Sequence, residues 1–222
     1  MHFLSIYCFL IVNTIGSVDD LIEKLQSKCK VLENLSLHLF NKFESKEYIN
    51  FSEVFICING GTFKSKDYVP YSNYKLITIK NVDDNGFNTS SISYLNESFI
   101  DKRYQLKIGD ILLTMTGNIG RVGIVDEENC YLNQRVLKVI CKSKLYLYAY
   151  LIKYKGIIIT LGKGTAQLNL SLEDLNKLII NNSLEEINKF SKYDYIFDYL
   201  VNIKLQIKKL KEIKSKLLEK YF

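Results

Sequence analysis

Hydrophobic residues near the start of the chain recur at alternating steps of three and four. They are Ile15, Val18, Ile22, Leu25, Cys29, Leu32, Leu35 or Ser36, and Leu39. This spacing predicts a long amphipathic helix over residues 17–43, with an apolar seam that can pair with a second helix. Ser17, followed by Asp20 three residues later, is the predicted start of this helix.

The segment before this helix, residues 1–16, is strongly apolar between Phe3 and Val12. It resembles the core of a signal peptide, but it has no basic stretch before it and no small-residue cleavage pattern after it. It is also too short to span a bilayer. We expect this segment to begin a helix or strand that packs on the domain. The protein is then expected to be cytoplasmic, without a membrane anchor; a secreted domain is the alternative.

The pattern changes over residues 44–185, where short apolar runs alternate with polar turns. The runs lie at 54–58, 76–82, 111–115, 122–125 and 136–140. Runs of this length between turns are typical of strands, and Asn85-Gly86 suits a tight hairpin. Helical spacing returns briefly at 145–155 and at 171–178, the latter with Ser171 as N-cap. The central region is therefore predicted to be β-rich within an α+β fold.

Residues 186–222 again show the spacing of a long helix. The apolar positions are Ile196, Leu200, Ile203, Ile207, Leu210, Ile213 and Leu217. Seven lysines and two glutamates give residues 202–222 a charge of +5, which is typical of a solvated helix face, with a DNA contact as the alternative. A shift of 179 residues aligns seven identities within positions 19–43, so the two predicted helices are an internal repeat.

Composition excludes several classes of protein. Hydrophobic residues make up 47% of the chain, which is too many for a disordered protein. The five cysteines are widely spaced without a C-x-x-C pair, and the two histidines lie far apart, so neither a disulfide framework nor a metal site is predicted. A phosphate-binding Gly-Lys-Ser/Thr loop is absent, and Pro70 is the only proline, which excludes a methyltransferase Asn/Asp-Pro-Pro motif. We therefore predict a non-catalytic protein without a cofactor.

The stretch from Gly109 to Asn133 is the most informative part of the sequence. Two strand-like runs flank a loop, residues 116–121, that carries two glycines, an asparagine and an arginine. Such a hairpin loop can approach a phosphate or a base edge closely, although an ordinary solvated turn has the same composition. Residues 60–170 contain 15 Lys and Arg against 9 Asp and Glu, the mildly basic balance expected of a nucleic-acid surface.

Four motifs in order carry a family resemblance. They are the Gly60–Phe63 loop, the strand at 77–82, GDILLTMTGNIGRVG at 109–123 followed by Leu-Asn-Gln at 132–134, and GTAQLNLS at 164–171. Together they resemble the target recognition domain of the specificity subunit of type I restriction–modification systems, in a half-length form. The resemblance implies one recognition domain between two spacer helices that pair antiparallel. The Pro-rich segment that often precedes the second helix is missing at 179–186.

The resemblance places the candidate DNA-binding residues in the polar loops. Basic side chains there would contact phosphates, while Arg, Asn and Gln would read base edges. Asn133 and Gln134 could instead cap a turn, and Asn169 could cap the helix that follows it. The candidates are Lys64, Ser65, Lys66, Tyr71, Asn118, Arg121, Asn133, Gln134, Arg135, Lys163, Thr165, Gln167 and Asn169.

The resemblance also implies partners. These are double-stranded DNA, methyltransferase subunits docked on the helices, and through them the restriction subunit. With one recognition domain, we expect half of a bipartite target to be bound by each chain, in a homodimer or a pair with another half-subunit. The alternative is a non-catalytic coiled-coil assembly protein, or an inactive remnant of a specificity subunit.

Overall fold

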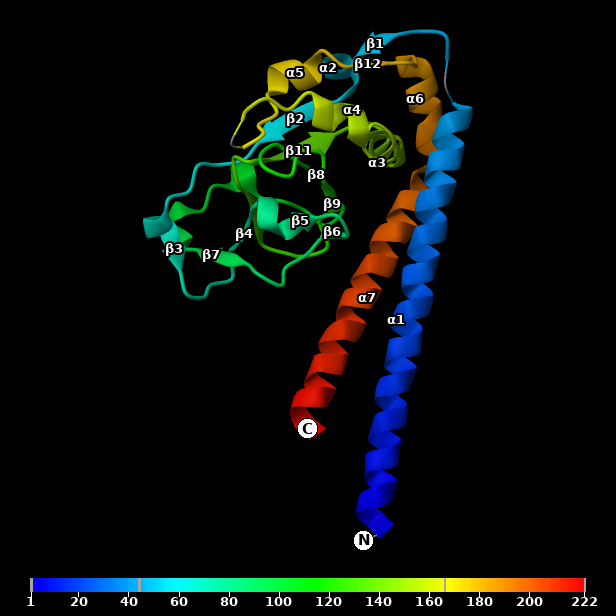
Figure 1. Cartoon of the computed structure of the whole chain (residues 1–222), viewed down its shortest axis with the longest axis vertical. Coiled ribbons are helices and arrows are strands. Elements are labelled where there is room, and N and C mark those ends of the chain that lie inside the picture. The colour runs from blue at the N-terminus through cyan, green and yellow to red at the C-terminus, as the bar shows by residue number, and fades with distance from the viewer. Residues whose placement is uncertain (1, 44, 166, 222) are drawn as a thin grey trace.

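The computed structural model describes residues 2–43, 45–165 and 167–221, and the side chains from residue 11 onward within these ranges. Two long helices, α1 (His2–Lys42) and α7 (Asp194–Tyr221), enclose a β-rich region that extends from β1 (Ile49–Asn50) to β12 (Ile179–Ile180). Figure 1 shows the helices side by side, with the β-rich region beside the upper part of the pair. The predicted α+β fold is confirmed.

Helices α1 and α7 pair antiparallel through the predicted seam (Figure 1). Ile22, Leu25 and Cys29 of α1 are buried, as are Leu200 and Ile203 of α7. Ion pairs flank the seam: Lys214 Nζ lies 2.6 Å from Asp19 Oδ1, and Lys204 Nζ lies 3.6 Å from Glu33 Oε1. As the residue number rises along α1 it falls along α7, which is the register of an antiparallel pair.

The first helix begins earlier than predicted. Helix α1 starts at His2, so Ser17 lies inside the helix and does not cap it; its hydroxyl donates to the Asn13 carbonyl over 2.9 Å. The apolar run that suggested a separate segment contains no proline, so nothing in it prevents continuous helical hydrogen bonding. The expected packing of residues 1–10 on a domain lies outside the described side chains.

The second long helix is interrupted. Helix α6 (Leu184–Phe190) is followed by a 3₁₀ turn, η5 (Ser191–Tyr193), before α7 begins. The turn brings Asp194 to the start of α3 (Lys144–Lys153), where its carboxylate accepts hydrogen bonds from Ser143 Oγ at 2.6 Å and Leu145 N at 3.1 Å. A side-chain contact distant in sequence therefore fixes where α7 begins, and periodicity could not locate it.

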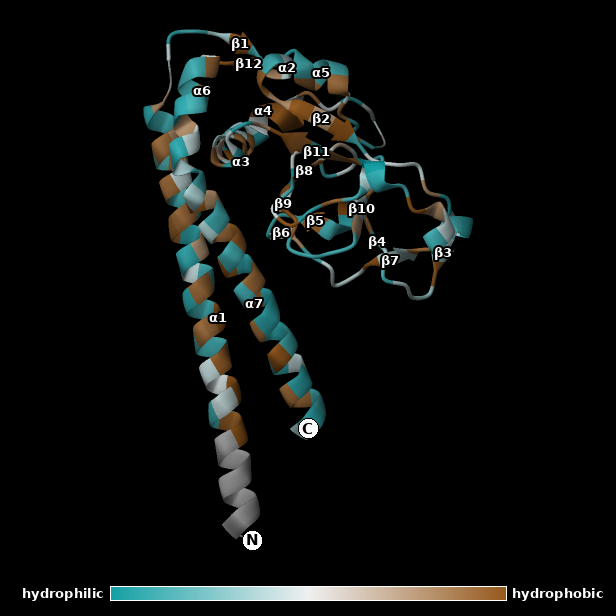
Figure 2. Ribbon diagram, turned by 180° about the vertical axis from the view of Figure 1, so that it is seen from behind, coloured by the Kyte–Doolittle hydropathy of each residue, from teal (hydrophilic) through white to brown (hydrophobic). Residues whose placement is uncertain are grey.

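The first of the two larger sheets is antiparallel throughout. Its order is β2 (Ile56–Asn59), β11 (Val136–Ile140), β8 (Ile111–Thr114) and β9 (Val122–Ile124). The β8–β9 hairpin is the one predicted from the sequence, and Leu113 lies opposite Val122. Figure 2 shows hydrophobic ribbon concentrated in β2 and β11, and Leu112, Leu113 and Leu137 have no exposed surface.

The second larger sheet lies farther from the helices. Its order is β10 (Cys130–Leu132), β4 (Lys75–Ile77), β7 (Ser93–Leu95) and β3 (Tyr68–Val69), with β10 and β4 parallel. The strand predicted over 76–82 ends early, because the Asn81 carboxamide accepts from the Thr78 N–H over 3.0 Å and starts the 3₁₀ turn η2 (Ile79–Asn81). The predicted hairpin joins β5 (Val82–Asp83) to β6 (Gly86–Phe87), but its two turn residues are Asp84 and Asn85, one position earlier than predicted, and Gly86 begins β6 with a φ of +107°.

Shorter elements complete the β-rich region. Strands β1 and β12 pair antiparallel, and Ser171 caps α5 as predicted by accepting from the Asp174 N–H over 3.0 Å. The remaining helices and turns are α2 (Phe51–Val54), η1 (Ser65–Asp67), η3 (Glu97–Phe99), η4 (Lys102–Tyr104), α4 (Lys155–Thr160) and α5 (Leu172–Asn176).

Helix α3 joins the two parts of the molecule. Its residues 145–151 are buried, and it contacts both α1 and α7. Aromatic rings surround it, with Phe40 of α1 4.8 Å from Tyr146 and Phe55 5.0 Å from Tyr150 between ring centroids. Buried residues of the β-rich region and of both long helices form one core. Burial of so many aromatic rings strongly stabilises the contact of α3 with the helices. None of the described helices is long and apolar enough to cross a membrane.

Candidate nucleic-acid interface

Four loops meet at one edge of the first sheet. Because its strands are antiparallel, the ends of β2 and β8 and the beginnings of β9 and β11 lie along the same edge. The loops at 60–64, 115–121 and 133–135 leave from there. Residues 162–170 join them, since Gly117 N donates to Leu168 O and Leu170 N to Met115 O, both over 2.8 Å. Four loops that are separate in sequence, which carry three of the four family motifs, are thus adjacent in space.

The 60–64 and 133–135 loops are joined directly. Gln134 N donates to Gly61 O over 3.0 Å, and the Thr62 hydroxyl donates to Gln134 Oε1 over 2.8 Å. A Cβ at Gly60 would lie 2.4 Å from the Asn133 backbone, so only glycine allows this approach. The Thr62 contact fixes the orientation of the Gln134 carboxamide, with its nitrogen turned away from Thr62.

Asn133, Gln134 and Arg135 have different surroundings. Asn133 is 9% exposed, and its Oδ1 accepts from the Arg135 N–H over 3.2 Å, so its side chain caps the turn. Gln134 and Arg135 are exposed. Within the described part of the chain, the Arg135 guanidinium has no hydrogen bond or ion pair. The turn therefore presents an amide and a guanidinium on two consecutive exposed residues at the sheet edge.

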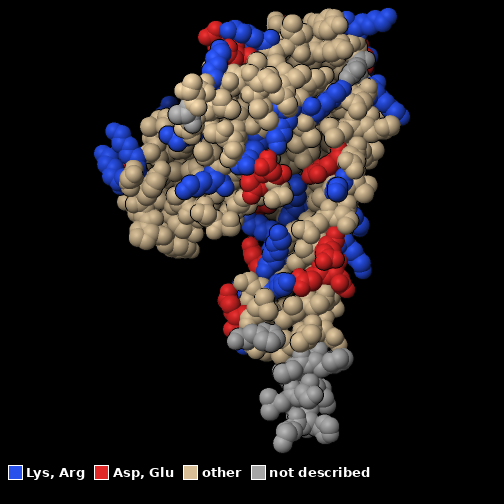
Figure 3. Space-filling view, in the orientation of Figure 1, with Lys and Arg blue, Asp and Glu red and all other residues tan. Residues whose placement is uncertain are grey.

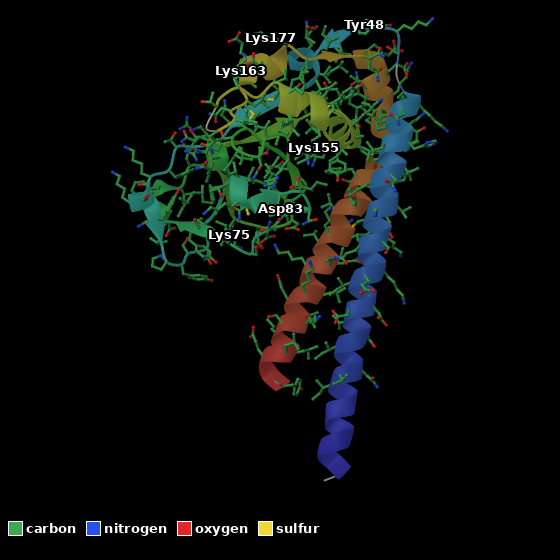
Figure 4. The ribbon with its side chains drawn as sticks, viewed as in Figure 1. Tyr48, Lys75, Asp83, Lys155, Lys163 and Lys177 are labelled. Carbon is green, nitrogen blue, oxygen red and sulfur yellow. The ribbon has the colours of Figure 1, made fainter. Side chains whose placement is uncertain are left out.

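The loop from Lys163 to Asn169 is closed by its own backbone. Lys163 N donates to Asn169 O over 2.9 Å, and Asn169 N donates to Lys163 O over 2.8 Å. Thr165, Gln167 and Asn169 are exposed, and Asn169 Nδ2 donates to Gln167 O over 3.3 Å. Lys163 extends beside α5 (Figure 4), where its ammonium lies 2.8 Å from the Asp174 carboxylate. The hydrogen bond from Lys163, followed by that from Ser171, lowers the pKa of Asp174 to about 2.

The Arg121 side chain is paired within the β-rich region. Its guanidinium lies 2.7 Å from Asp84 Oδ2, and Lys155 Nζ lies 3.0 Å from Asp84 Oδ1. The hydrogen bond from Arg121, followed by that from Lys155, holds the pKa of Asp84 below its usual range. Asn118 remains at the loop tip and is exposed. In this structure Arg121 therefore links two loops of the β-rich region.

The remaining candidates lie near β3 of the second sheet. Lys64, Ser65 and Lys66 are exposed at η1, where the Lys64 N–H donates to the buried Asp67 carboxylate over 2.7 Å. Tyr71 is 75% exposed, and its ring centroid lies 5.2 Å from that of Tyr94. Figure 3 shows basic side chains at this outer edge of the β-rich region, whereas several acidic ones lie nearer the helices.

The candidates thus form two groups. The loop-edge group is Asn118, Gln134, Arg135, Lys163, Thr165, Gln167 and Asn169. The tip group is Lys64, Ser65, Lys66 and Tyr71. Arg121 and Asn133 belong to neither, because their side chains are bonded within the fold and also mostly buried; the Lys163 side chain is paired too, but it is 74% exposed. Among the described residues, no cluster of His, Cys, Asp or Glu has the arrangement of a metal site.

The family model described as "Type I restriction modification DNA specificity domain" matches residues 43–215. The chain belongs to this family. The match includes the four loops, the tip group and most of α7, so the resemblance predicted from the motifs is confirmed. A comparison with curated proteins gives no match.

Solved structures share the fold. The S subunit of a type I system from M. genitalium superposes with a TM-score of 0.62 at 18% identity, over 96% of this chain and 60% of that one. The HsdS subunit from Thermoanaerobacter tengcongensis gives 0.52 at 16%, over 95% and 55%. A chain from a study of type I R-M complex assembly and conformational transition gives 0.51 at 15%, over 96% and 57%. The chain therefore spans about 55 to 60% of these structures.

Two contributors to the specificity domain surface were not among the predicted residues. Thr62 orients Gln134, and Tyr94 supports Tyr71. Thr62 lies within the Gly60–Phe63 motif, so its place in the motif was an available signal. No sequence signal indicated Tyr94, because the pairing of Val69 with Tyr94 joins strands 25 residues apart in sequence.

Proposed function

We propose that this chain is the DNA sequence-recognition subunit of a type I restriction–modification complex and binds one half of a bipartite duplex target. The observation that carries the proposal is the meeting of four polar loops at one sheet edge, where Gln134 and Arg135 are both exposed. A partner subunit would carry out methyl transfer with S-adenosylmethionine, and this chain would select the DNA sequence.

The loop-edge group has the chemistry needed to read bases. An arginine can donate two hydrogen bonds to O6 and N7 of guanine, and Gln or Asn can pair with N6 and N7 of adenine. The Thr62 contact pre-orients the Gln134 carboxamide, which limits the entropy lost on binding. Lys64 and Lys66 of the tip group would contact phosphates and contribute salt-dependent affinity.

The helix pair would supply the docking surface for methyltransferase subunits, and through them for the restriction subunit. Apolar side chains remain exposed on both helices after the two have paired, including Leu21 and Val31 of α1 and Ile213 of α7. Exposed apolar side chains along paired helices are typical of surfaces that bind other proteins. The same surface would bring two copies together, or join this chain to another half-subunit, and a symmetric pair would read inverted half-sites.

Selection from a random duplex library by the chain together with its methyltransferase subunits tests this function. We expect a split motif whose binding weakens steeply with salt. Arg135→Gln should lower specific affinity about 10- to 100-fold, because a bidentate arginine–guanine pair contributes about 1–3 kcal/mol. Affinity for unrelated duplexes should change much less.

Lys142→Gln is the matched control, because Lys142 is exposed, also carries one positive charge and follows β11 at the end opposite to the loop edge. It should leave the selected motif and its affinity unchanged. Binding with no preferred sequence, or equal losses for Arg135→Gln and Lys142→Gln, would contradict the proposal. The first of these results would favour an assembly protein or an inactive remnant.

A further inference from the structure

A chain of ion pairs connects the second sheet to α7. Lys208 Nζ of α7 bonds to Glu127 Oε2 and lies 3.3 Å from Asp126 Oδ1, in the acidic turn between β9 and β10. Glu127 Oε1 also accepts from Lys75 Nζ of β4 over 2.7 Å. We call these four residues, Lys75, Asp126, Glu127 and Lys208, the acidic-turn clamp.

The clamp is shielded from solvent. Its side chains are 17 to 25% exposed, which is much less than typical surface pairs such as Lys177 and Glu173, at 63% and 82%. Burial alone would raise the pKa of Glu127, yet the hydrogen bonds from Lys208 and Lys75 hold it below its usual range. Loss of one partner would leave a half-buried charge uncompensated, which is costly.

The clamp attaches α7 to the β-rich region far from the contacts of α3. Helix α3 meets the start of α7, where Asp194 bonds to the N-terminus of α3 and Phe197 packs on Tyr148, and Tyr148 also donates to Glu33 of α1. Lys208 lies fourteen residues after Asp194 in the sequence, about 21 Å at 1.5 Å per residue. The contacts of α3 alone would leave the β-rich region able to tilt about that helix, whereas a further attachment this far along α7 restricts the tilt.

We propose that Lys208 is a positioning residue: through Glu127 and Asp126 it sets the tilt of the β-rich region against the helix pair. Because each β-rich region would read one half-site, the tilt fixes the spacer length that a pair of them accepts. The part concerning spacer length rests on the proposed function. The part concerning tilt does not.

Pulsed electron spin resonance on the full chain tests the tilt. Spin labels on non-natural side chains at two exposed positions, Lys102 of η4 and Lys216 of α7, report the distance between the second sheet and the helix. We expect one narrow distance distribution for the wild type and for Lys208→Arg, which keeps the charge. Lys208→Met should broaden or shift it.

Lys209→Met is the matched control, because Lys209 is the next residue on α7 and is exposed. It should leave the distribution unchanged. Glu127→Gln provides a second, smaller change that weakens both links of the clamp and should broaden the distribution if Lys208→Met fails to fold. An unchanged distribution in a folded Lys208→Met or Glu127→Gln protein would overturn the proposal.

Targets with spacers that differ by single base pairs test the consequence for DNA. The wild type with its partner subunits should prefer one spacer length, and Lys208→Met should bring the binding ratio between the best and the next length close to one. An altered distance distribution with an unchanged spacer preference would overturn the spacing part. If neither the wild type nor Lys208→Met selects DNA, while the distance distribution of Lys208→Met is altered, the proposed function is contradicted and the part concerning tilt stands.

Discussion

At the scale of single residues, Asn133 shows how an amide in a polar loop supports its neighbours. Its backbone N–H donates to Ile77 O over 3.0 Å, and its side chain accepts from the Arg135 N–H. Both bonds are largely shielded from solvent, so they hold the turn in one conformation. The exposed side chains of Gln134 and Arg135 are thereby directed outward, where the proposed contact with base edges takes place.

Burial also determines the reactivity of the thiols. It raises the pKa of Cys57 and Cys130 to about 12 and that of Cys141 to about 11. The thiolate is the reactive form, so at pH 8 only about one Cys130 in ten thousand is reactive. We expect iodoacetamide to leave these three cysteines unmodified in the folded chain at pH 8 and to modify them in urea.

Mass spectrometry of peptides measures this modification separately at each cysteine. Labelling should accelerate as the pH rises toward 11, since deprotonation then becomes less unfavourable. Modification of Cys130 in the folded protein at the rate of a free thiol would contradict the buried position of β10.

At the scale of elements, the helices and strands that were predicted correctly are the ones with local sequence signals. The β8–β9 hairpin, α3 and α5 follow from runs, turns and a serine cap within about fifteen residues. The parallel pairing of β4 with β10 and the pairing of β3 with β7 were not predicted, because they join two- and three-residue strands far apart in the chain. The ion pair between Arg121 and Asp84 was not predicted for the same reason, since the two residues are distant in sequence.

The junction of α3 with α7 depends on one carboxylate. Asp194 accepts from Ser143 Oγ and from the backbone N–H groups of Lys144 and Leu145, which caps α3 from a second helix. Asp194→Ala should lower the free energy of unfolding by about 1–3 kcal/mol, because partly buried donors lose their acceptor. Urea unfolding monitored by circular dichroism measures the change.

Asp198→Ala is the control for this junction. Asp198 is exposed one turn farther along α7, and its removal should change the free energy of unfolding by less than about 0.5 kcal/mol. Equal effects of the two substitutions would show that Asp194 contributes only as a surface charge, and the role of this junction in holding α7 on α3 would then be wrong.

At the scale of the whole molecule, the β-rich region is attached to both long helices. Tyr148 of α3 donates to Glu33 of α1 over 3.0 Å, while Asp194 and Lys208 attach α7. A region held at three places moves with the helix pair as one unit. The four motifs indicated the family and the polar loops from the sequence alone, but only the folded chain shows which loop residues are exposed together and how the loops are oriented on the helices.

The central claim is that the loop-edge group of this specificity domain chooses the DNA sequence that a partner methyltransferase modifies. Long-read mapping of modified bases, in cells carrying the partner with the wild-type chain, with Arg135→Gln or with neither, tests it most directly. We predict a split methylated motif that appears only with the wild-type chain and that is lost or relaxed at one position with Arg135→Gln. A palindromic motif would indicate two copies of this chain, and an asymmetric motif a different half-subunit as partner. Absence of any new motif, with the same partner active alongside another specificity subunit, would contradict the account.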